Sequence, residues 1–212
     1  DDVYYHEKIE SAINCIVENG FIDEKTIINC SSNVIDAEGR EVTRIGRPVK
    51  KGLRTSNEMF NGFMSGNALN GCALLIPKRA LEVAGEFNTE YIYILDWIYW
   101  IELSLLGYNF YQCSEVLVKN RRHESQVSVK KKDLLDRETE KFILELIDRV
   151  SDDEEKLQNI WLYCRRIGFY KGCLEIENIA SISRRMKIKG AFRWMFKRFV
   201  IIIKNVLSLF AK

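Results

Sequence analysis

The sequence predicts an α/β domain with a mixed sheet, followed by a helical extension. Up to residue 128, uncharged runs of strand length alternate with segments whose apolar residues recur at helical spacing. From Lys131 onward the pattern is helical to the end of the chain. Hydrophobic residues form 47% of the 212-residue chain and charged residues 29%, a balance typical of a folded protein with its own core.

The first third of the chain predicts a helix and then strands. Apolar residues at 9, 13, 16 and 17 share one helical face, and Asn19-Gly20 provides a C-terminal stop. Residues 26–30 predict a short buried strand, and residues 33–42 predict a strand, a polar turn and a second strand. A short helix is expected around residues 57–64, within a loop rich in Gly and Lys.

The middle of the chain predicts further strands and helices in alternation. Residues 72–76 form an uncharged run of strand length, and a short helix over 79–83 follows. A stronger helix is predicted over 97–106, and Asp96 would begin it. Two strands are then predicted over 108–113 and 116–122.

The six cysteines are widely scattered, and no Cys-x-x-Cys pair occurs. This spacing argues against a zinc site or a redox dithiol. Cysteines in apolar contexts are usually buried, reduced thiols, and they favour a cytosolic location.

Two adjacent carboxylates, Asp1 and Asp2, stand ahead of the first predicted helix. They form a candidate ligand set for Mg²⁺ or Mn²⁺, hard cations that take carboxylate oxygens and often share them with substrate phosphates. The alternative is that both aspartates are solvated or cap the helix, because acidic residues favour helix N-termini.

Four patches together carry the functional signal. They are residues 1–10, DDVYYHEKIE; 70–88, NGCALLIPKRALEVAGEFN; 95–103, LDWIYWIEL; and 117–128, LVKNRRHESQVS. In this order they resemble the acidic motif, the Gly-containing strand with its Gly-x-Phe-Asp turn, the Asp-aromatic-x-x-Trp helix and the Tyr-Arg-x-His ending of family 2 glycosyltransferases. That family has the glycosyltransferase A-type fold.

The resemblance implies a fold and a domain organisation. Its acidic motif ends the nucleotide-binding half in that family, so residues 1–128 are expected to be the C-terminal half of an A-type catalytic domain. Residues 129–186 would form a helical extension, and residues 187–212 a basic amphipathic helix.

The resemblance also implies roles for the charged residues. Asp1, Asp2 and His123 would hold a divalent cation, Mn²⁺ or Mg²⁺, which stabilises the negative charge of a departing diphosphate. Asp96 would be the general base that takes the proton of the acceptor hydroxyl. The alternatives are that Asp96 only caps its helix and that His123 is a surface histidine at a strand end. Asp2, Asp96 and His123 are expected to converge on one cleft.

Three further residues are candidates for donor or acceptor binding. Gly71 would let the backbone approach the donor sugar, although it equally suits a bend before a buried strand. Trp97 could offer an aromatic face to a sugar ring or belong to the core, whereas Trp100 is expected in the core. Arg122, with Arg121, could meet a phosphate or lie on a solvated edge.

The C-terminal residues carry a separate signal. Residues 178–212 contain nine Lys or Arg and no Asp or Glu, whereas the first 177 residues carry 23 basic and 30 acidic residues. The segment from residue 187 combines a wide apolar face with a narrow basic stripe, a pattern typical of a helix in an anionic membrane interface. The alternative is a helix packed on the protein's own core. A nucleic acid is a poorer partner, because the face is too apolar.

Taken with the resemblance, these features imply an inverting, metal-dependent enzyme. It would move a sugar from a nucleotide diphosphate sugar to a glycan or lipid-linked acceptor, as a cytoplasmic protein held peripherally at the inner face of a bacterial plasma membrane. The alternative is a non-catalytic, membrane-associated interaction module that retains the fold. Leu95 stands where the family often has an acid or Gln, and Ile98 where it often has a second Asp, and both favour this alternative. The presence of Asp1, Asp2, Asp96 and His123 together favours the enzyme. Because the resemblance places the nucleotide-binding half ahead of Asp1, we expect the isolated 212 residues to be inactive and to bind nucleotide sugar weakly or not at all.

Overall fold

The computed structural model describes residues 2–21, 24–42, 51–122, 132–182 and 187–188. The chain divides into two compact units, Asp1–Leu135 and Asp136–Lys212. The predicted boundary at residue 128 and most of the predicted basic helix over 187–212 lie outside the described residues, so both stay predictions.

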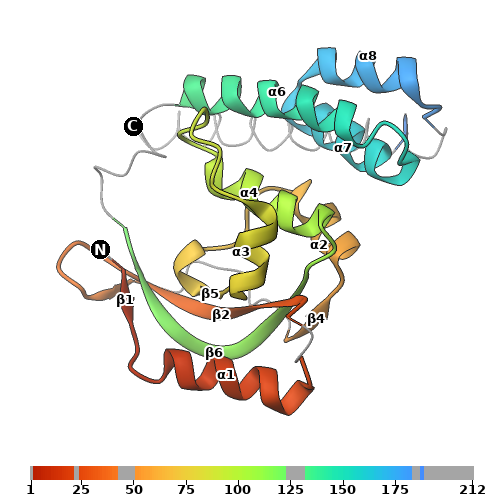
Figure 1. Ribbon diagram of the computed structural model, residues 1–212. Helices are drawn as coiled ribbons and strands as arrows, with labels where there is room; N and C mark the ends of the chain where they lie inside the picture. Colours follow the sequence, from red (N-terminus) through yellow and green to blue (C-terminus); the bar gives the residue numbers. More distant parts are fainter. Residues whose placement is uncertain (1, 22–23, 43–50, 123–131, 183–186, 189–212) are drawn as a thin grey trace, which may run out of the picture. The chain divides into compact units, whose positions relative to one another are not determined.

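The first unit contains a mixed sheet with two long central strands. Strand β2 (Thr26–Ile35) lies parallel to β6 (Asn109–Arg121), with irregular register between Asn29 and Ser32. Two parallel strands need a long crossover between them, and here the crossover contains most of the helices of the unit (Figure 1).

Four short strands complete the sheet within the described residues. β1 (Val3–Tyr4) pairs antiparallel with β6, and β3 (Glu41–Val42) pairs antiparallel with β2. β4 (Gly52–Arg54) pairs with β6 and β5 (Leu74–Leu75) with β2, both antiparallel. The predicted fold class is confirmed: the chain is α/β with a mixed sheet, consistent with half of an A-type glycosyltransferase fold.

Helices cover both faces of this sheet (Figure 1). Helix α1 (Lys8–Asn19) lies on one face, and it ends at Gly20, whose φ of 68° is the left-handed conformation that favours glycine. On the other face lie α2 (Ser56–Phe63), α3 (Lys78–Ala84) and α4 (Leu95–Leu105). The helical stop predicted at Asn19-Gly20 is therefore confirmed.

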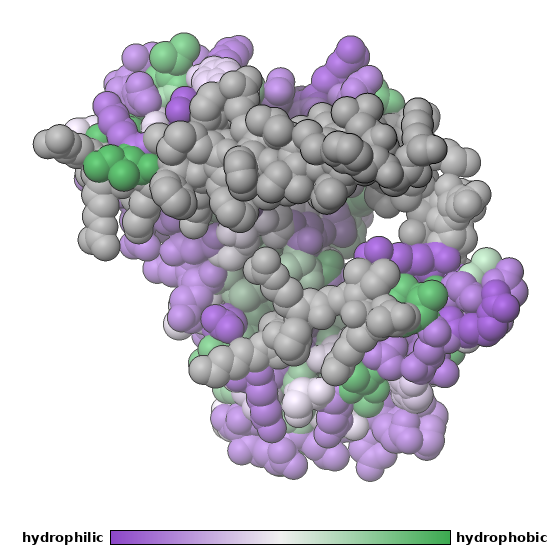
Figure 2. Space-filling view, turned by 180° about the vertical axis from the view of Figure 1, so that it is seen from behind, coloured by the Kyte–Doolittle hydropathy of each residue, from purple (hydrophilic) through white to green (hydrophobic). Residues whose placement is uncertain are grey.

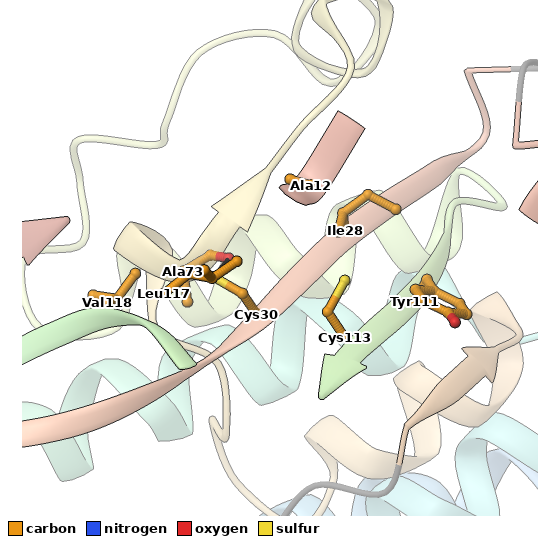
Figure 3. Close-up of a cluster of buried hydrophobic side chains, with 8 residues drawn as sticks. All are labelled: Ala12, Ile28, Cys30, Ala73, Tyr111, Cys113, Leu117 and Val118. Atoms are coloured by element: carbon orange, nitrogen blue, oxygen red, sulfur yellow. Dashed lines mark hydrogen bonds between the residues drawn. The ribbon is translucent and has the colours of Figure 1, made fainter. Parts of the chain in front are cut away.

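The core beneath α1 joins residues from four elements (Figure 3). One of these elements is a short 3-10 turn, η1 (Gly71–Ala73), directly before β5. The buried members of the cluster are Ala12, Ile28, Cys30, Ala73, Tyr111, Cys113, Leu117 and Val118. This cluster fixes α1, η1 and the two long strands together, and it therefore fixes the loop that precedes η1.

Helix α4 is buried on nearly all sides, as an apolar helix without a polar face must be. Trp97 and Trp100 are 4% and 3% exposed, which confirms Trp100 as a core residue. Tyr99 stacks on Phe87 at 4.2 Å between ring centroids, and its hydroxyl donates to the carbonyl of Gly85 at 2.8 Å. These contacts hold the start of α4 against the end of α3.

The element boundaries correct several predictions. The strand expected over 26–30 and the first strand expected within 33–42 form one strand, β2, whereas the polar turn and second strand expected there are confirmed, with β3 at Glu41–Val42. The strands expected over 108–113 and 116–122 form β6 alone. The strand expected over 72–76 shrinks to the two residues Leu74–Leu75, because the side chain of Asn70 accepts the N–H of Cys72 and tightens the chain into η1. The strong helix begins at Leu95, before Asp96.

The second unit is helical in its described part, as predicted. It contains most of α6 (Lys132–Arg149), and α7 (Glu154–Ile167) and α8 (Tyr170–Ile179). Asp153 caps α7 by accepting the N–H of Lys156 at 3.0 Å, and Trp161 Nε1 donates to Glu177 Oε1 at 2.9 Å. That bond ties α7 to α8.

Among the described residues, no helix combines the length and the apolar character that a bilayer crossing requires. Figure 2 shows the face opposite to that of Figure 1, where hydrophilic residues predominate among those described and hydrophobic residues form separate spots.

Candidate active site

The Asp2 carboxylate is held at the end of strand β6. Asp2 stands directly before β1, and β1 pairs with β6 through Val3 and Lys119. Asp2 Oδ1 accepts the backbone N–H of Arg121 at 2.8 Å. The side-chain amide of Asn120 donates to both carboxylate oxygens, at 3.4 and 3.2 Å.

A second segment reaches the same carboxylate from the loop before η1. Asn70 Nδ2 donates to Asp2 Oδ2 at 3.5 Å, and the thiol of Cys72 also hydrogen-bonds to Asp2. Burial raises the pKa of Asp2, but hydrogen bonds from the Arg121 N–H, Cys72, Asn70 and Asn120 outweigh it and leave that pKa below its usual value. The carboxylate is therefore ionised at neutral pH.

The Asp96 carboxylate lies in the first turn of α4 and is half-buried. Its Oδ2 accepts from Asn67 Nδ2 at 3.0 Å, and its Oδ1 accepts the N–H of Trp97 at 2.7 Å. Helix α4 begins at Leu95, the residue before Asp96, and Ile94 is its N-cap residue. The alternative in which Asp96 caps the helix is therefore wrong. A carboxylate in this first turn is still stabilised by the helix dipole.

One short segment connects the two carboxylates. Asn67 binds Asp96 and Asn70 binds Asp2, and these asparagines are three residues apart. Their Cα atoms lie at most about 11 Å apart, because consecutive Cα atoms are about 3.8 Å apart. Asp2 and Asp96, which are distant in sequence, are therefore brought to the two ends of one loop.

The predicted sugar-binding residues occupy different environments. Gly71 is exposed between Asn70 and Cys72, and a Cβ placed on it would lie 3.5 Å from the Trp100 ring, an ordinary contact. Trp97 is buried, and its Nε1 donates to the carbonyl of Phe63 at 3.2 Å. Its ring belongs to the core and does not present a face to a ligand in this structure.

The arginine pair separates into two roles. Arg121 Nη1 donates to the carbonyls of Asp36 and Ala37, at 3.0 and 2.8 Å, and so closes the turn between β2 and β3. The Arg122 N–H donates to the carbonyl of Ile35 at 2.8 Å, while the residue itself is exposed. Arg122 is the member of the pair whose position leaves it accessible to an anionic ligand.

The predicted cation site is only partly described. Asp1 and His123 lie outside the described residues, and within these no group of three or more His, Cys, Asp or Glu is arranged to hold a metal ion. The Asp2 carboxylate by itself fits a hard divalent cation, because it is ionised, half-buried and fixed in orientation.

Sequence reasoning missed the amides around the two carboxylates, Asn67, Asn70 and Asn120. Asparagine is common in turns and at strand ends, so its presence gave no signal for a site. Asn70 had a weak signal, because it precedes Gly71 at the start of a predicted strand.

No family model matches the chain. The chain is similar to an uncharacterized glycosyltransferase of Rickettsia prowazekii, with 27% identity over 128 residues that cover 60% of this chain and 39% of the relative. Uncharacterized glycosyltransferases of Rickettsia felis and Rickettsia conorii are 28% and 27% identical over 130 residues, which cover 61% of this chain and 21% of each relative. The chain thus spans less than half the length of these curated relatives. All three relatives bear the name glycosyltransferase.

Proposed function

We propose that this chain contributes the acceptor side and the cation ligands of a family 2 glycosyltransferase, which transfers a sugar from a nucleotide diphosphate donor with inversion. The observation that supports the proposal most directly is the pair of carboxylates, Asp2 and Asp96, bound by amides of one four-residue loop. The glycosyltransferase relatives support the same reaction class.

In this proposal Asp96 is the general base. An acceptor hydroxyl that donates a hydrogen bond to the Asp96 carboxylate would pass its proton there while its oxygen attacks the anomeric carbon of the sugar. The bond between that carbon and the diphosphate oxygen breaks, and both electrons leave with the diphosphate. Attack from the side opposite the leaving group inverts the anomeric centre.

Asp2 has a different role, because its carboxylate is surrounded by donors that keep it ionised. Asp2, with Asp1 and His123 as further ligands, would hold Mn²⁺ or Mg²⁺. Such a cation, when bound, stabilises the charge of the diphosphate leaving group. Arg122 is exposed and directly follows β6, the strand whose end holds Asp2. Arg122 would contact a phosphate oxygen from this position.

The experiment that tests this proposal is transfer from labelled nucleotide diphosphate sugars by the protein expressed from its complete reading frame. Asp96→Asn keeps the shape and removes the base, so transfer should fall by roughly 10²–10⁴-fold. Glu18→Gln, a change of an exposed acid near the end of α1 and outside the four patches, serves as the control and should leave the rate unchanged. Transfer at the parental rate by Asp96→Asn would refute the base assignment, and a complete absence of transfer with every donor would favour the non-catalytic module.

A further inference from the structure

The two loop asparagines use their amide groups in the same way. The Asn67 side-chain oxygen accepts the N–H of Leu69 at 3.1 Å, and the Asn70 side-chain oxygen accepts the N–H of Cys72 at 3.0 Å. In each case the amide oxygen binds the backbone two residues further on, as in an Asx turn. This arrangement fixes the orientation of both amides, so each NH₂ group is directed to a carboxylate, Asp96 in one case and Asp2 in the other.

We propose that Asn67 and Asn70 are positioning residues for the transfer reaction, with Asn67 fixing the proposed base Asp96 and Asn70 supporting the proposed cation ligand Asp2. This inference rests on the proposed function and adds to it the residues that set the orientation of its two carboxylates. Neither asparagine contacts a reacting atom in the proposal, because each acts through a carboxylate.

The contacts at Asp96 make Asn67 the more important of the two. The Trp97 N–H holds Oδ1 of Asp96, and Asn67 holds Oδ2, so the two bonds together fix the plane of the carboxylate. Asp2, by contrast, also accepts hydrogen bonds from Arg121, Asn120 and Cys72. Loss of the Asn67 donor should therefore disturb its carboxylate more than loss of the Asn70 donor.

The neutral amide is essential to this role. Asn67→Asp keeps an oxygen for the Leu69 N–H, so the turn survives, but it replaces the donating NH₂ by an anionic oxygen beside Asp96. Like charges at about 3 Å repel, and the Asp96 carboxylate has to turn away. Because Asn67 is exposed, this substitution leaves the core unchanged.

The chain offers a matched control for this change. The side chain of Asn88 forms the same turn, with its oxygen accepting the N–H of Glu90 at 3.0 Å, and it is exposed and hydrogen-bonds to neither Asp2 nor Asp96. Asn88→Asp therefore introduces the same charge and the same geometry away from both carboxylates.

The kinetic test uses the protein expressed from its complete reading frame. Asn67→Asp should lower kcat by about 10²-fold, the loss that a misplaced catalytic group produces, while the KM for the nucleotide sugar stays within about twofold. Asn67→Ser, which retains a neutral donor and the turn, should recover part of the rate. Rates for Asn67→Asp equal to those of Asn88→Asp would overturn the positioning role.

A second measurement tests the contact without any need for activity. Asn67→Asp should lower the midpoint of thermal unfolding by roughly 2–4 °C, and Asp96→Asn should remove most of that decrease, because the repelling partner is gone. If Asn67→Asp lowers the unfolding midpoint equally in the parent and in the Asp96→Asn variant, the Asn67–Asp96 contact is overturned. If this coupling is found but no donor supports transfer, the proposed function fails while the structural contact stands.

Discussion

At the scale of single residues, the candidate site surrounds two carboxylates with neutral donors. Asp2 and Asp96 accept from backbone N–H groups, from asparagine amides and, for Asp2, from a thiol. Neutral donors orient a carboxylate without cancelling its charge, whereas a Lys or Arg partner would compete with a cation or a proton. Asp2 therefore retains the negative charge that its proposed role as a cation ligand requires.

The lowered pKa of Asp2 predicts how stability depends on pH. Its pKa is lower in the folded protein than in the unfolded chain, so the folded state binds this proton less tightly. The stabilisation is present above the ordinary carboxyl pKa and is lost as the pH falls through the lowered value. The difference in the free energy of unfolding between the parent and Asp2→Asn should therefore be largest above about pH 5 and shrink towards about pH 3. Urea unfolding at several pH values measures it, and a difference independent of pH would contradict the assigned hydrogen bonds.

Two helical glycines give opposite predictions from the same substitution. A Cβ on Gly172 would lie 2.7 Å from Phe169 Cδ1 and 2.8 Å from Cys164 Sγ, whereas a Cβ on Gly62 would meet no atom within 4 Å. Gly172→Ala should therefore destabilise the protein by about 1–3 kcal/mol through overpacking. Gly62→Ala, its control, should stabilise by roughly 0.5–1 kcal/mol because alanine favours a helix. Both values come from urea unfolding, and a stabilising Gly172→Ala would show that Phe169 moves aside.

At the scale of elements, local periodicity predicted the type of most segments, and long-range pairing decided their ends. Breaks were predicted after residue 30 in β2 and after residue 113 in β6, yet the parallel pair bridges both, since Ser31 pairs with Val116 and Gln112 Nε2 donates to Ser31 Oγ at 3.4 Å. The partner of each lies far away in the sequence, so local patterns could not reveal the continuous strands. The carboxylates Asp2 and Asp96 were predicted as site residues because they stand in patches that resemble motifs of the glycosyltransferase family. The amides that position them were not, since only the fold brings Asn67 and Asn70 beside them.

The start of α2 allows a direct test of an element boundary. The Thr55 side chain accepts the N–H of Glu58 at 3.3 Å, and the Glu58 carboxylate accepts the N–H of Thr55 at 2.8 Å, forming a capping box. Thr55→Ala should lower the free energy of unfolding by about 1 kcal/mol. Thr55→Ser, which keeps the hydroxyl, should lower it much less. Equal effects of the two substitutions would show that the cap contributes nothing to stability.

At the scale of the whole chain, the charge is divided unevenly between its parts. Residues 178–212 carry nine basic residues and no acidic ones, while the first 177 carry seven more acidic than basic residues, 30 against 23. An acidic body would be repelled by an anionic surface, so attraction to such a surface has to come from the C-terminal segment. A sugar transferase that acts on a lipid-linked acceptor would gain from such attraction, because it brings the protein to the surface that carries the acceptor.

This division predicts selective binding to anionic vesicles. Each Lys or Arg near an anionic membrane surface contributes about 1 kcal/mol, so replacing Lys189, Arg193, Lys197 and Lys204 by Gln should weaken binding by up to roughly a thousandfold. Replacing four exposed basic residues elsewhere, Lys78, Arg79, Lys141 and Lys171, removes the same net charge and serves as the control. Co-sedimentation with phosphatidylglycerol vesicles measures both, and added salt should weaken the parental binding because exposed charges are screened. If the two quadruple variants bind equally, net charge alone governs the association, and the C-terminal segment is then better explained as a helix packed on the protein itself.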